Sequence, residues 1–469
     1  MAVWSQVKLS SFSDDFRFDA EYYRPEVLAL RRSVNAGRWP TQTVEQLSES
    51  VINFGAYSLC NEIDFLDDEG LDDASVRFIT AQDIQDGFID FANARWISRK
   101  QHAGLLSKSQ VSSGQVLVAM AARLGHAAVY EGSDPLNSSQ DIAKISIRDP
   151  KQVDPHYLSV YLNSRIGRGL LLASQTGSVQ QHTNLGRIKS TQVVILPYEQ
   201  QRLIASVYRR AIEKRQSTAR TVDAAESLLL KYLGLDHLDL SAQKYYTRSF
   251  ADLHSADRFG AEYFMPCKQR VLNALAKMPH RKIVDLAPNI QLLWDPAQAA
   301  RGEEVRNYDL TDALEPFLED IPPQLGAEIG STKKRMQNGD VVISRLRSYL
   351  KEIAVVRTTD IVPTIGSSEF IVLRPKSGGI SAETLMIYLR CSLVQTVLKW
   401  SQDGSNHPRF NAEDLVAIPV PDAVLQAQGK IDALVKKSRE QRSEALELLA
   451  QAKQTVEDMI TGASARKGR

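Results

Sequence analysis

The residue types that most often carry out catalysis are present in this chain, but they lack the spacing that catalysis needs. No GxGxxG or GxxxxGK[ST] phosphate loop occurs, and HExxH, GxSxG and NPPY-like segments are also missing. A nuclease-like set built on Asp422 and Lys430 would need an acid where the chain has Gln428. The remaining candidates are isolated histidines: His102, His126, His182 and His407. The sequence therefore favours a binding protein, and we expect no catalytic residues and no enzyme activity.

Metal binding and disulfide formation are also disfavoured by the residue spacing. The acidic segment from Glu62 to Asp73 could hold a divalent metal, but acidic surface loops are far commoner, so we expect no metal site. Cys60, Cys267 and Cys391 lie far apart without CxxC spacing, which is typical of a reduced cytoplasmic protein. Neither a membrane span nor a signal peptide is indicated, so a cytoplasmic location is expected. A fused enzyme with a site in the acidic segment stays open as an alternative.

Two polar, turn-rich segments carry side chains suited to hydrogen bonding with nucleobases and phosphates. Gly177 to Asn184 and Gly404 to Arg409 each follow a segment that is expected to be helical. Asn and Gln match adenine, Arg matches guanine, and Ser and Thr suit the sugar–phosphate backbone. A solvated turn would have the same composition and is the plain alternative. The candidate DNA-binding residues here are Ser178, Gln180, Gln181, His182, Asn184, Ser405, Asn406, His407 and Arg409.

A second set of candidates lies in a basic stretch. The net charge of the whole chain is only +1, but residues 331–357 hold seven Lys or Arg residues against two acids. A local basic surface of this kind suits phosphate binding, although an ordinary basic hairpin tip is the alternative. The candidates in this stretch are Lys333, Lys334, Arg335, Arg345, Arg347, Ser348, Tyr349 and Lys351. In the first half of the chain, Arg123 and His126 occupy the matching hairpin tip.

The candidates occur in pairs because the chain contains an internal repeat. RFDAEYYRP at 17–25 recurs as RFGAEYFMP at 258–266, with six of nine residues identical. YLNS at 161–164 corresponds to YLRC at 388–391, and TGS at 176–178 corresponds to DGS at 403–405. Two copies of one unit in one polypeptide suggest two equivalent tasks at a fixed separation.

Each copy is followed by a segment with the features of a long helix. Residues 200–233 contain no Gly or Pro, and residues at alternating steps of three and four predict a heptad seam. That seam is Ile204, Val207, Ala211, Lys214, Thr218, Thr221, Ala225, Leu228 and Tyr232. It recurs 227 positions later as Ile431, Leu434, Ser438, Gln441, Ala445, Leu448, Ala452, Thr455 and Met459. The shared register predicts that the two helices pair as an antiparallel coiled coil, and Gly234 and Gly462 are placed to end them.

The regions before the helices are rich in short β-type runs divided by Gly, Asp, Asn and Pro. The segments 155–174 and 383–401 each predict one helix. The expected fold is therefore α+β, with two pseudo-repeated β-rich globular domains, each followed by a long helix. The expected boundaries are 1–198 for the first globular domain, 199–236 for its helix, 237–422 for the second domain, 423–461 for its helix, and 462–469 for a basic tail.

This order of domains and helices resembles the specificity subunit of type I restriction–modification systems. RxDAEYYxP resembles the opening of a target recognition domain in that family, and GDVVISRLRSYLKEIAVV at 339–356 resembles its strand–loop–strand. GSVQQHTNLGRIKSTQVVILPYEQQRLI at 177–204 is similar to its Gly-Ser loop, closing strand and helix start. The first strand–loop, GQVLVAMAARLGH, lacks the Ser-Arg pair, and the second helix begins VLQAQGKI without Glu-Gln.

The resemblance implies a non-catalytic DNA-recognition subunit that takes part in phage defence. Each target recognition domain would read half of a bipartite site in double-stranded DNA, and the helix pair would set the unread spacer. Two methyltransferase subunits would bind this chain, and restriction or translocase subunits could join through them. The resemblance implies no cofactor on this chain, while S-adenosylmethionine would be bound by the methyltransferase partners. A duplicated protein-interaction scaffold without DNA specificity is the alternative.

Overall fold

The computed structural model describes most of the chain. The described residues are 6–7, 20–54, 61–66, 71–72, 74–91, 94–173, 182–256, 259–298, 300, 302–359, 361–404 and 407–463. No helix within these ranges has an apolar stretch long enough to cross a membrane.

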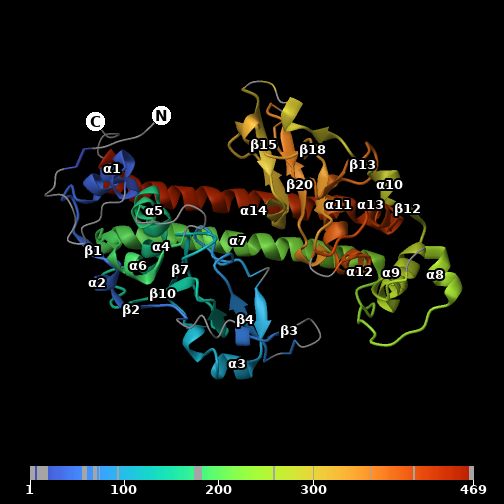
Figure 1. The fold of residues 1–469 in the computed structure, drawn as a ribbon, viewed down its shortest axis with the longest axis horizontal. Coiled ribbons are helices and arrows are strands. Elements are labelled where there is room, and N and C mark those ends of the chain that lie inside the picture. The colour runs from blue at the N-terminus through green and yellow to red at the C-terminus, as the bar shows by residue number, and fades with distance from the viewer. Residues whose placement is uncertain are drawn as a thin grey trace. The chain divides into compact units, whose positions relative to one another are not determined.

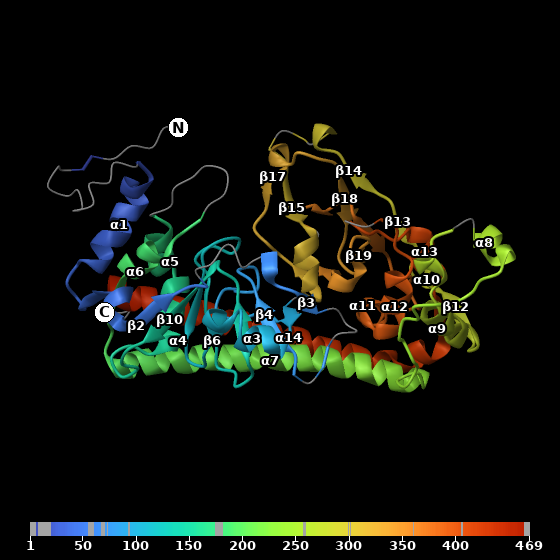
Figure 2. The same ribbon diagram turned by 60° about the horizontal axis from the view of Figure 1, so that its bottom comes forward.

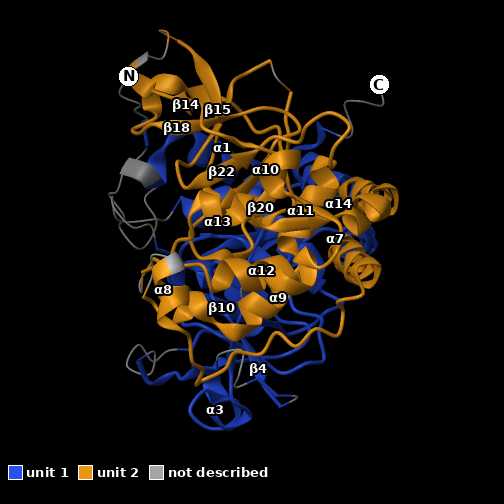
Figure 3. Cartoon of the chain, turned by 90° about the vertical axis from the view of Figure 1, so that its right-hand side faces the viewer, with its two compact units in different colours: residues 1–216, 442–469 blue, residues 217–441 orange. Residues whose placement is uncertain are grey.

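The chain divides into two compact units, coloured separately in Figure 3. Unit 1 consists of residues 1–216 and 442–469, and unit 2 consists of residues 217–441. The division passes through two long helices, α7 (Tyr198–Leu233) and α14 (Asp422–Thr461), so each unit contains a part of both. The expected helices were 199–236 and 423–461. Gly234 and Gly462 follow the two helices with positive φ angles of 63° and 77°, the conformation that ends a helix most easily at glycine.

Unit 1 contains a four-stranded sheet in the order β2-β10-β7-β8, a five-stranded sheet in the order β3-β5-β4-β9-β6, and the pair β1-β11. Its strands are β1 Thr41–Thr43, β2 Ser48–Ile52, β3 Phe65–Leu66, β4 Val76–Ile79, β5 Arg95–Ile97, β6 Gln110–Val111, β7 Val116–Ala119, β8 Ala127–Val129, β9 Leu136–Ser138, β10 Ile142–Ile147 and β11 Gln192–Val194. Its shorter helices are α1 Pro25–Val34, α2 Val44–Leu47, α3 Arg99–Ala103, α4 Pro155–Asn163, α5 Arg165–Leu172 and α6 Leu185–Ser190.

Unit 2 contains the sheets β13-β22-β19-β20-β16 and β14-β18-β21-β15-β17, and the pair β12-β23. Its strands are β12 His280–Lys282, β13 Asn289–Ile290, β14 Leu293–Trp294, β15 Glu304–Tyr308, β16 Phe317–Glu319, β17 Gln324–Leu325, β18 Lys333–Met336, β19 Val341–Ser344, β20 Ile353–Arg357, β21 Thr364–Gly366, β22 Phe370–Leu373 and β23 Pro419–Pro421. Its shorter helices are α8 Phe250–Ala256, α9 Pro266–Ala276, α10 Ile283–Leu286, α11 Ala382–Arg390, α12 Ser392–Lys399 and α13 Ala412–Val416.

The central strands of the two units share one topology, as the sequence repeat predicts, while among the described residues unit 2 has an additional edge strand, β16. The order β2-β10-β7-β8 corresponds to β13-β22-β19-β20, and the parallel pair β4-β9 corresponds to the parallel pair β15-β21. A hydrogen bond at the start of each long helix also recurs. The Asp154 amide donates to Gln201 Oε1 at 2.9 Å, and the Ser381 amide donates to Gln428 Oε1 at 2.9 Å. Gln428, which broke the nuclease-like pattern, therefore has a structural partner.

The segments 155–174 and 383–401 each form two helices, so the expectation of a single helix in each half was wrong. Ser164 separates α4 from α5 with φ −66° and ψ 158°, and Cys391 separates α11 from α12 with φ −63° and ψ 151°. Both residues are extended, so they interrupt the helical hydrogen bonding. The Ser164 hydroxyl accepts a hydrogen bond from the Gly167 amide at 3.1 Å, which caps the second helix.

The long helices lie side by side and run antiparallel (Figures 1 and 2). In unit 2, Lys430 lies over the Tyr232 ring at 5.4 Å, while the Ser438 hydroxyl donates to the Thr218 carbonyl at 3.5 Å. In unit 1, Lys214 Nζ lies 2.7 Å from Glu444 Oε2. As the residue number increases along α7, from 214 to 218 to 232, the number of the contacting residue in α14 decreases, from 444 to 438 to 430. The expected antiparallel pairing is confirmed.

The heptad seam drifts from the expected positions. Toward the end of α7 the buried residues are Leu229 and Leu233, at 0% and 5% exposure, while Leu228 and Tyr232 are only partly buried. An α-helix has 3.6 residues per turn, so a strict 3.5-residue pattern slides around its surface. The buried set of α7 recurs 227 positions later in α14, and its pairs include Ile204/Ile431, Tyr208/Val435, Ala211/Ser438, Thr218/Ala445, Thr221/Leu448, Ala225/Ala452, Leu229/Val456 and Leu233/Ile460.

Each hydrophobic core contains residues of both long helices. Leu229 of α7 and Ile431 of α14 belong to the core of unit 2, whereas Ile204 of α7 and Leu449 of α14 belong to the core of unit 1. The polar contacts follow the same pattern. Glu226 of α7 accepts from the amide that begins α12 at 2.9 Å, and Glu457 of α14 accepts from the amide that begins α5 at 2.7 Å. Each globular region is therefore completed by the end of the helix that belongs to the other repeat.

Leucine-to-alanine changes test this exchange of helix ends. Leu229→Ala should destabilise unit 2 by about 2–5 kcal/mol, and Leu449→Ala should destabilise unit 1 by a similar amount, because each leaves a cavity in a packed core. Leu203→Ala, at a residue that is 60% exposed, is the matched control. Amide hydrogen exchange measured by mass spectrometry gives the location. If Leu229→Ala speeds amide hydrogen exchange in α4 and α5 of unit 1 and leaves α11 and α12 of unit 2 unchanged, the assignment of helix ends to the opposite unit is wrong.

Candidate nucleic-acid interface

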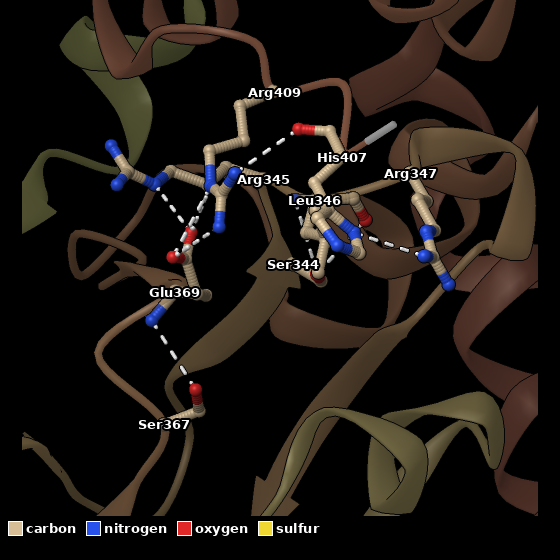
Figure 4. A network of polar contacts seen from close by, with 8 residues as sticks. All are labelled: Ser344, Arg345, Leu346, Arg347, Ser367, Glu369, His407 and Arg409. Atoms are coloured by element: carbon tan, nitrogen blue, oxygen red, sulfur yellow. Dashed lines mark hydrogen bonds and ion pairs between the residues drawn. The ribbon is translucent and has the colours of Figure 1, made fainter. Parts of the chain in front are cut away.

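The candidate site of unit 2 lies in the connection between β19 and β20, where three arginines gather (Figure 4). Backbone hydrogen bonds fix its start. The Arg345 amide donates to the Glu369 carbonyl at 3.1 Å, and the Phe410 amide donates to the Arg345 carbonyl at 3.1 Å. The Arg347 amide donates to the Pro408 carbonyl at 2.9 Å. Segments that lie far apart in the sequence, 345–347, 369 and 407–410, therefore form one surface region.

Glu369 binds two of the three arginines. Arg345 Nε donates to Glu369 Oε2 at 2.8 Å, while Arg409 donates from Nε and from a terminal nitrogen to Glu369 Oε1 at 3.2 and 3.0 Å. The hydrogen bonds from Arg409, followed by those from Arg345, lower the pKa of Glu369 despite the opposing effect of burial. The carboxylate is therefore ionised at neutral pH, and the three groups together carry a single positive charge.

Arg347 and His407 form a second polar pair in the same region. A terminal nitrogen of Arg347 lies 3.0 Å from His407 Nδ1, and His407 is exposed. The backbone of the loop is unusual, because Arg347 and Lys351 both have a φ of 51°, which is rare for residues other than glycine. Between them lies the 3₁₀ helix η10 (Ser348–Leu350), in which Tyr349 is 61% exposed and Ser348 is buried. Tyr349 is thus displayed at the tip, whereas Ser348 faces the protein.

The remaining basic candidates of unit 2 face different neighbours. Lys351 Nζ lies 3.9 Å from Glu226 Oε2, so it faces helix α7. Lys334 in β18 pairs with Gly366, the last residue of the strand that leads toward Glu369. Arg335 is exposed and Lys333 is half-buried, and alternation along a strand places both on the face opposite to Lys334.

The corresponding loop of unit 1 has a similar backbone and different side chains. Met120 takes the place of Arg345, since its amide donates to the Asp141 carbonyl at 2.8 Å and its carbonyl accepts from the Thr183 amide at 3.0 Å. Ala122, with a φ of 53°, takes the place of Arg347. Arg123 is exposed at this tip.

His126 lies at the end of the same loop and is mostly buried. Burial, reinforced by the positive charge of Arg168, lowers the pKa of His126 to about 4. The side chain is therefore neutral at neutral pH and does not act as a cationic phosphate ligand. Its Nδ1 is buried and has no hydrogen-bond partner among the described residues.

The two Gly-Ser loops are only partly described. Ser178, Gln180, Gln181, Ser405 and Asn406 lie outside the described residues. His182 is exposed and corresponds in sequence to Arg409. Asn184 begins α6, and its side-chain oxygen accepts from the Arg187 amide at 3.0 Å. Asn184 is thus a helix cap, a role that its position before a helix could have revealed.

Sequence reasoning missed Glu369. An acid is not an obvious DNA ligand, and its link to Arg345 and Arg409 depends on contacts between distant segments. Cys267 and Cys391 are buried free thiols, and the described part of the chain contains no cluster of three or more metal-ligating side chains. Cys60 lies outside the described residues, as does part of the acidic segment 62–73.

Comparisons with known proteins find similar solved structures. No protein-family model matches the chain, and no curated protein does. The type I restriction–modification S subunit from M. genitalium is 13% identical, with 90% of this chain and 96% of that chain covered and a TM-score of 0.38. The HsdS subunit from Thermoanaerobacter tengcongensis is 15% identical, with 91% and 97% covered and a TM-score of 0.31.

A chain from a study of assembly and conformational transition of the type I R-M system is also similar. It is 15% identical, covers 90% of this chain and 98% of its own length, and has a TM-score of 0.31. Likenesses this weak do not assign the chain to a family.

The buried His126 predicts a pH dependence of stability. Its pKa is about 4 when folded and near 6.5 when unfolded, so the unfolded chain takes up the proton first as the pH falls. The contribution to stability is complete above about pH 6.5 and is lost progressively toward pH 4, by at most about 3 kcal/mol. His126→Gln, which cannot titrate, should flatten this part of the profile. Thermal unfolding of the wild type and of His126→Gln is measured between about pH 4.5 and 7.5. If the unfolding temperatures of the two proteins change in parallel with pH, the prediction is wrong.

Proposed function

We propose that this chain is the non-catalytic DNA-specificity subunit of a type I restriction–modification complex. One observation carries the proposal: two equivalent loops share a backbone while their side chains differ, with Met120, Ala122 and His182 in place of Arg345, Arg347 and Arg409. A repeated frame with altered tips is what two readers of different DNA sequences require, because base reading is carried by side chains on loops that tolerate change.

In this proposal each unit reads one half of a bipartite target in double-stranded DNA. The paired helices act as the ruler, since the separation of two half-sites is a geometric quantity that a stiff element can fix. Arg123 and His182 in unit 1, and Arg345 and Arg347 in unit 2, supply contacts to bases and phosphates, while Arg409 holds Glu369 in the same loop region. Lys333, Lys334 and Arg335 add phosphate contacts, which strengthen binding without selecting a sequence.

The partners follow from the same proposal. Two methyltransferase subunits dock on this chain and bring S-adenosylmethionine with them, and restriction or translocase subunits join through these partners. A duplicated protein-interaction scaffold is the competing function. The gathering of three arginines at the loop of unit 2 favours nucleic acid over that scaffold.

A gel-shift experiment separates the two functions. The chain is co-expressed with a candidate type I methyltransferase subunit from the same genome, and the purified complex is offered a random-sequence duplex library. Enrichment of a split motif with a constant spacer supports the specificity subunit. Stable assembly with the methyltransferase but no enrichment of any sequence would leave only the scaffold.

Exchange of one reading region should change one half-site only. Residues 331–409 lie within unit 2, so replacing them with the same region of another specificity subunit should alter that half and keep the other. Mapping of methylated bases in cells that express the chimaera gives the result. A folded chimaera whose two half-sites both change would refute independent reading.

Shortening the helix pair should shorten the spacer. Removing residues 214–220 from α7 and 438–444 from α14 deletes two heptads that lie alongside each other, as the Lys214–Glu444 ion pair indicates. At 1.5 Å per residue the pair becomes about 10 Å shorter, equal to roughly three base pairs. The same methylation mapping should show the original half-sites with a shorter gap. An unchanged gap would disprove the ruler, and deletion from α7 alone serves as the mismatched comparison.

A further inference from the structure

Arg345 is held in a way that suits base reading better than charge attraction. Its backbone is fixed on both sides by hydrogen bonds to Glu369 and Phe410, and its Nε is bound by the Glu369 carboxylate. Among the described residues, its two terminal nitrogens have no hydrogen-bond partner, and its side chain is 43% exposed. Figure 4 shows the guanidinium with these two nitrogens directed away from Glu369. A matched pair of N–H donors is therefore presented at a fixed angle.

The other two arginines are held differently. Arg409 uses Nε and one terminal nitrogen on Glu369, and its other terminal nitrogen donates to the His407 carbonyl at 3.1 Å. All of its nitrogens are thus engaged within the protein. Arg347 is bound through a terminal nitrogen to His407, a side chain that is itself exposed. Of the three arginines, only Arg345 has its Nε held by a carboxylate while both of its terminal nitrogens have no hydrogen-bond partner among the described residues.

A carboxylate at this position works against simple phosphate attraction. Glu369 cancels one of the two positive charges beside it and would repel a nearby phosphate. Phosphate binding alone would be stronger without it. Its presence makes sense where orientation matters more than charge, because a guanine offers two acceptors, N7 and O6, at the spacing of a guanidinium edge. A lysine lacks that fork and cannot make the same paired contact.

Unit 1 lacks this arrangement at the equivalent place. Met120 replaces Arg345 and is only 6% exposed, although Asp141 still occupies the position of Glu369. An acid is therefore present in both repeats, while the arginine that it would orient occurs in one. The two units differ in chemistry at one defined point of a common frame.

We propose that Arg345 reads a guanine in the half-site of unit 2, that Glu369 is the positioning residue for it, and that Met120 leaves the half-site of unit 1 without this contact. The inference rests on the proposed function and adds to it the identity of one base and the residue that reads it. Arg409 holds Glu369 from the other side and makes no base contact of its own.

Selection from the random duplex library by the assembled complex tests the inference. Arg345→Lys should give the same split motif with one G·C pair of one half relaxed, and discrimination at that pair should fall roughly 5- to 150-fold. Glu369→Gln should relax the same pair while binding to unrelated DNA becomes stronger, because a negative charge has been removed. The magnitude of the salt slope for unrelated DNA should then rise by about one. Loss of specificity together with a gain in general affinity is not expected from mere structural damage.

Arg281→Lys, in strand β12 and exposed, is the matched control and should leave the motif unchanged. Thermal unfolding of each variant confirms that it is folded. If the wild type enriches a split motif and both Arg345→Lys and Glu369→Gln keep every base of it, the inference is wrong and the proposed function stands. If the wild type enriches nothing, the proposed function itself fails.

Discussion

The exchange of helix ends between two hydrophobic cores is the constraint on which the rest of the fold depends. Residues such as Leu229 and Leu449 leave the repeat that encodes them and complete the core of the other one. The seam between the two helices contains polar residues, Thr218 in α7 and Ser438 and Gln441 in α14. The helices would therefore pair weakly by themselves, because polar residues in a coiled coil cost stability. Packing against the sheets and short helices of each unit supplies the missing apolar contacts, so helix pairing and domain folding are a single process.

This shared scaffold leaves the loops free to differ. The hydrogen bonds that fix Met120 and Arg345 are made by backbone groups, and backbone groups are the same whatever side chain is attached. The same backbone hydrogen bonds therefore hold Met120, which packs into the core of unit 1, and Arg345, whose side chain is exposed in unit 2. Rigid backbone and replaceable side chains are what a family of readers needs if it is to acquire new targets by substitution.

Much of the fold could be predicted from the sequence because the chain repeats itself. A 227-residue register in two long helical segments predicted both the helices and the repetition of their buried faces. The positions of Leu229 and Leu233 could not be predicted from a heptad pattern, since the real helical period differs from 3.5 and each helix also packs on a sheet. The break between helices α4 and α5 at Ser164 was not predicted, because serine is tolerated within helices. Glu369 and the burial of His126 depend on contacts between distant segments, and no local pattern encodes them.

The division of unit 1 into residues 1–216 and 442–469 has a consequence for biosynthesis. A ribosome makes the N-terminal part of unit 1 first, but Leu449, Val456 and Ile460 of its core are added last. Unit 2 is continuous in sequence and ends at residue 441, so all of its residues are synthesised before these three. The earliest domain to emerge is therefore the last to be finished, and until then it exposes the apolar surface that α14 will cover. Nascent chains of this protein should depend on chaperones that shield such surfaces, and premature termination within α14 should lead to degradation rather than to a half-functional product.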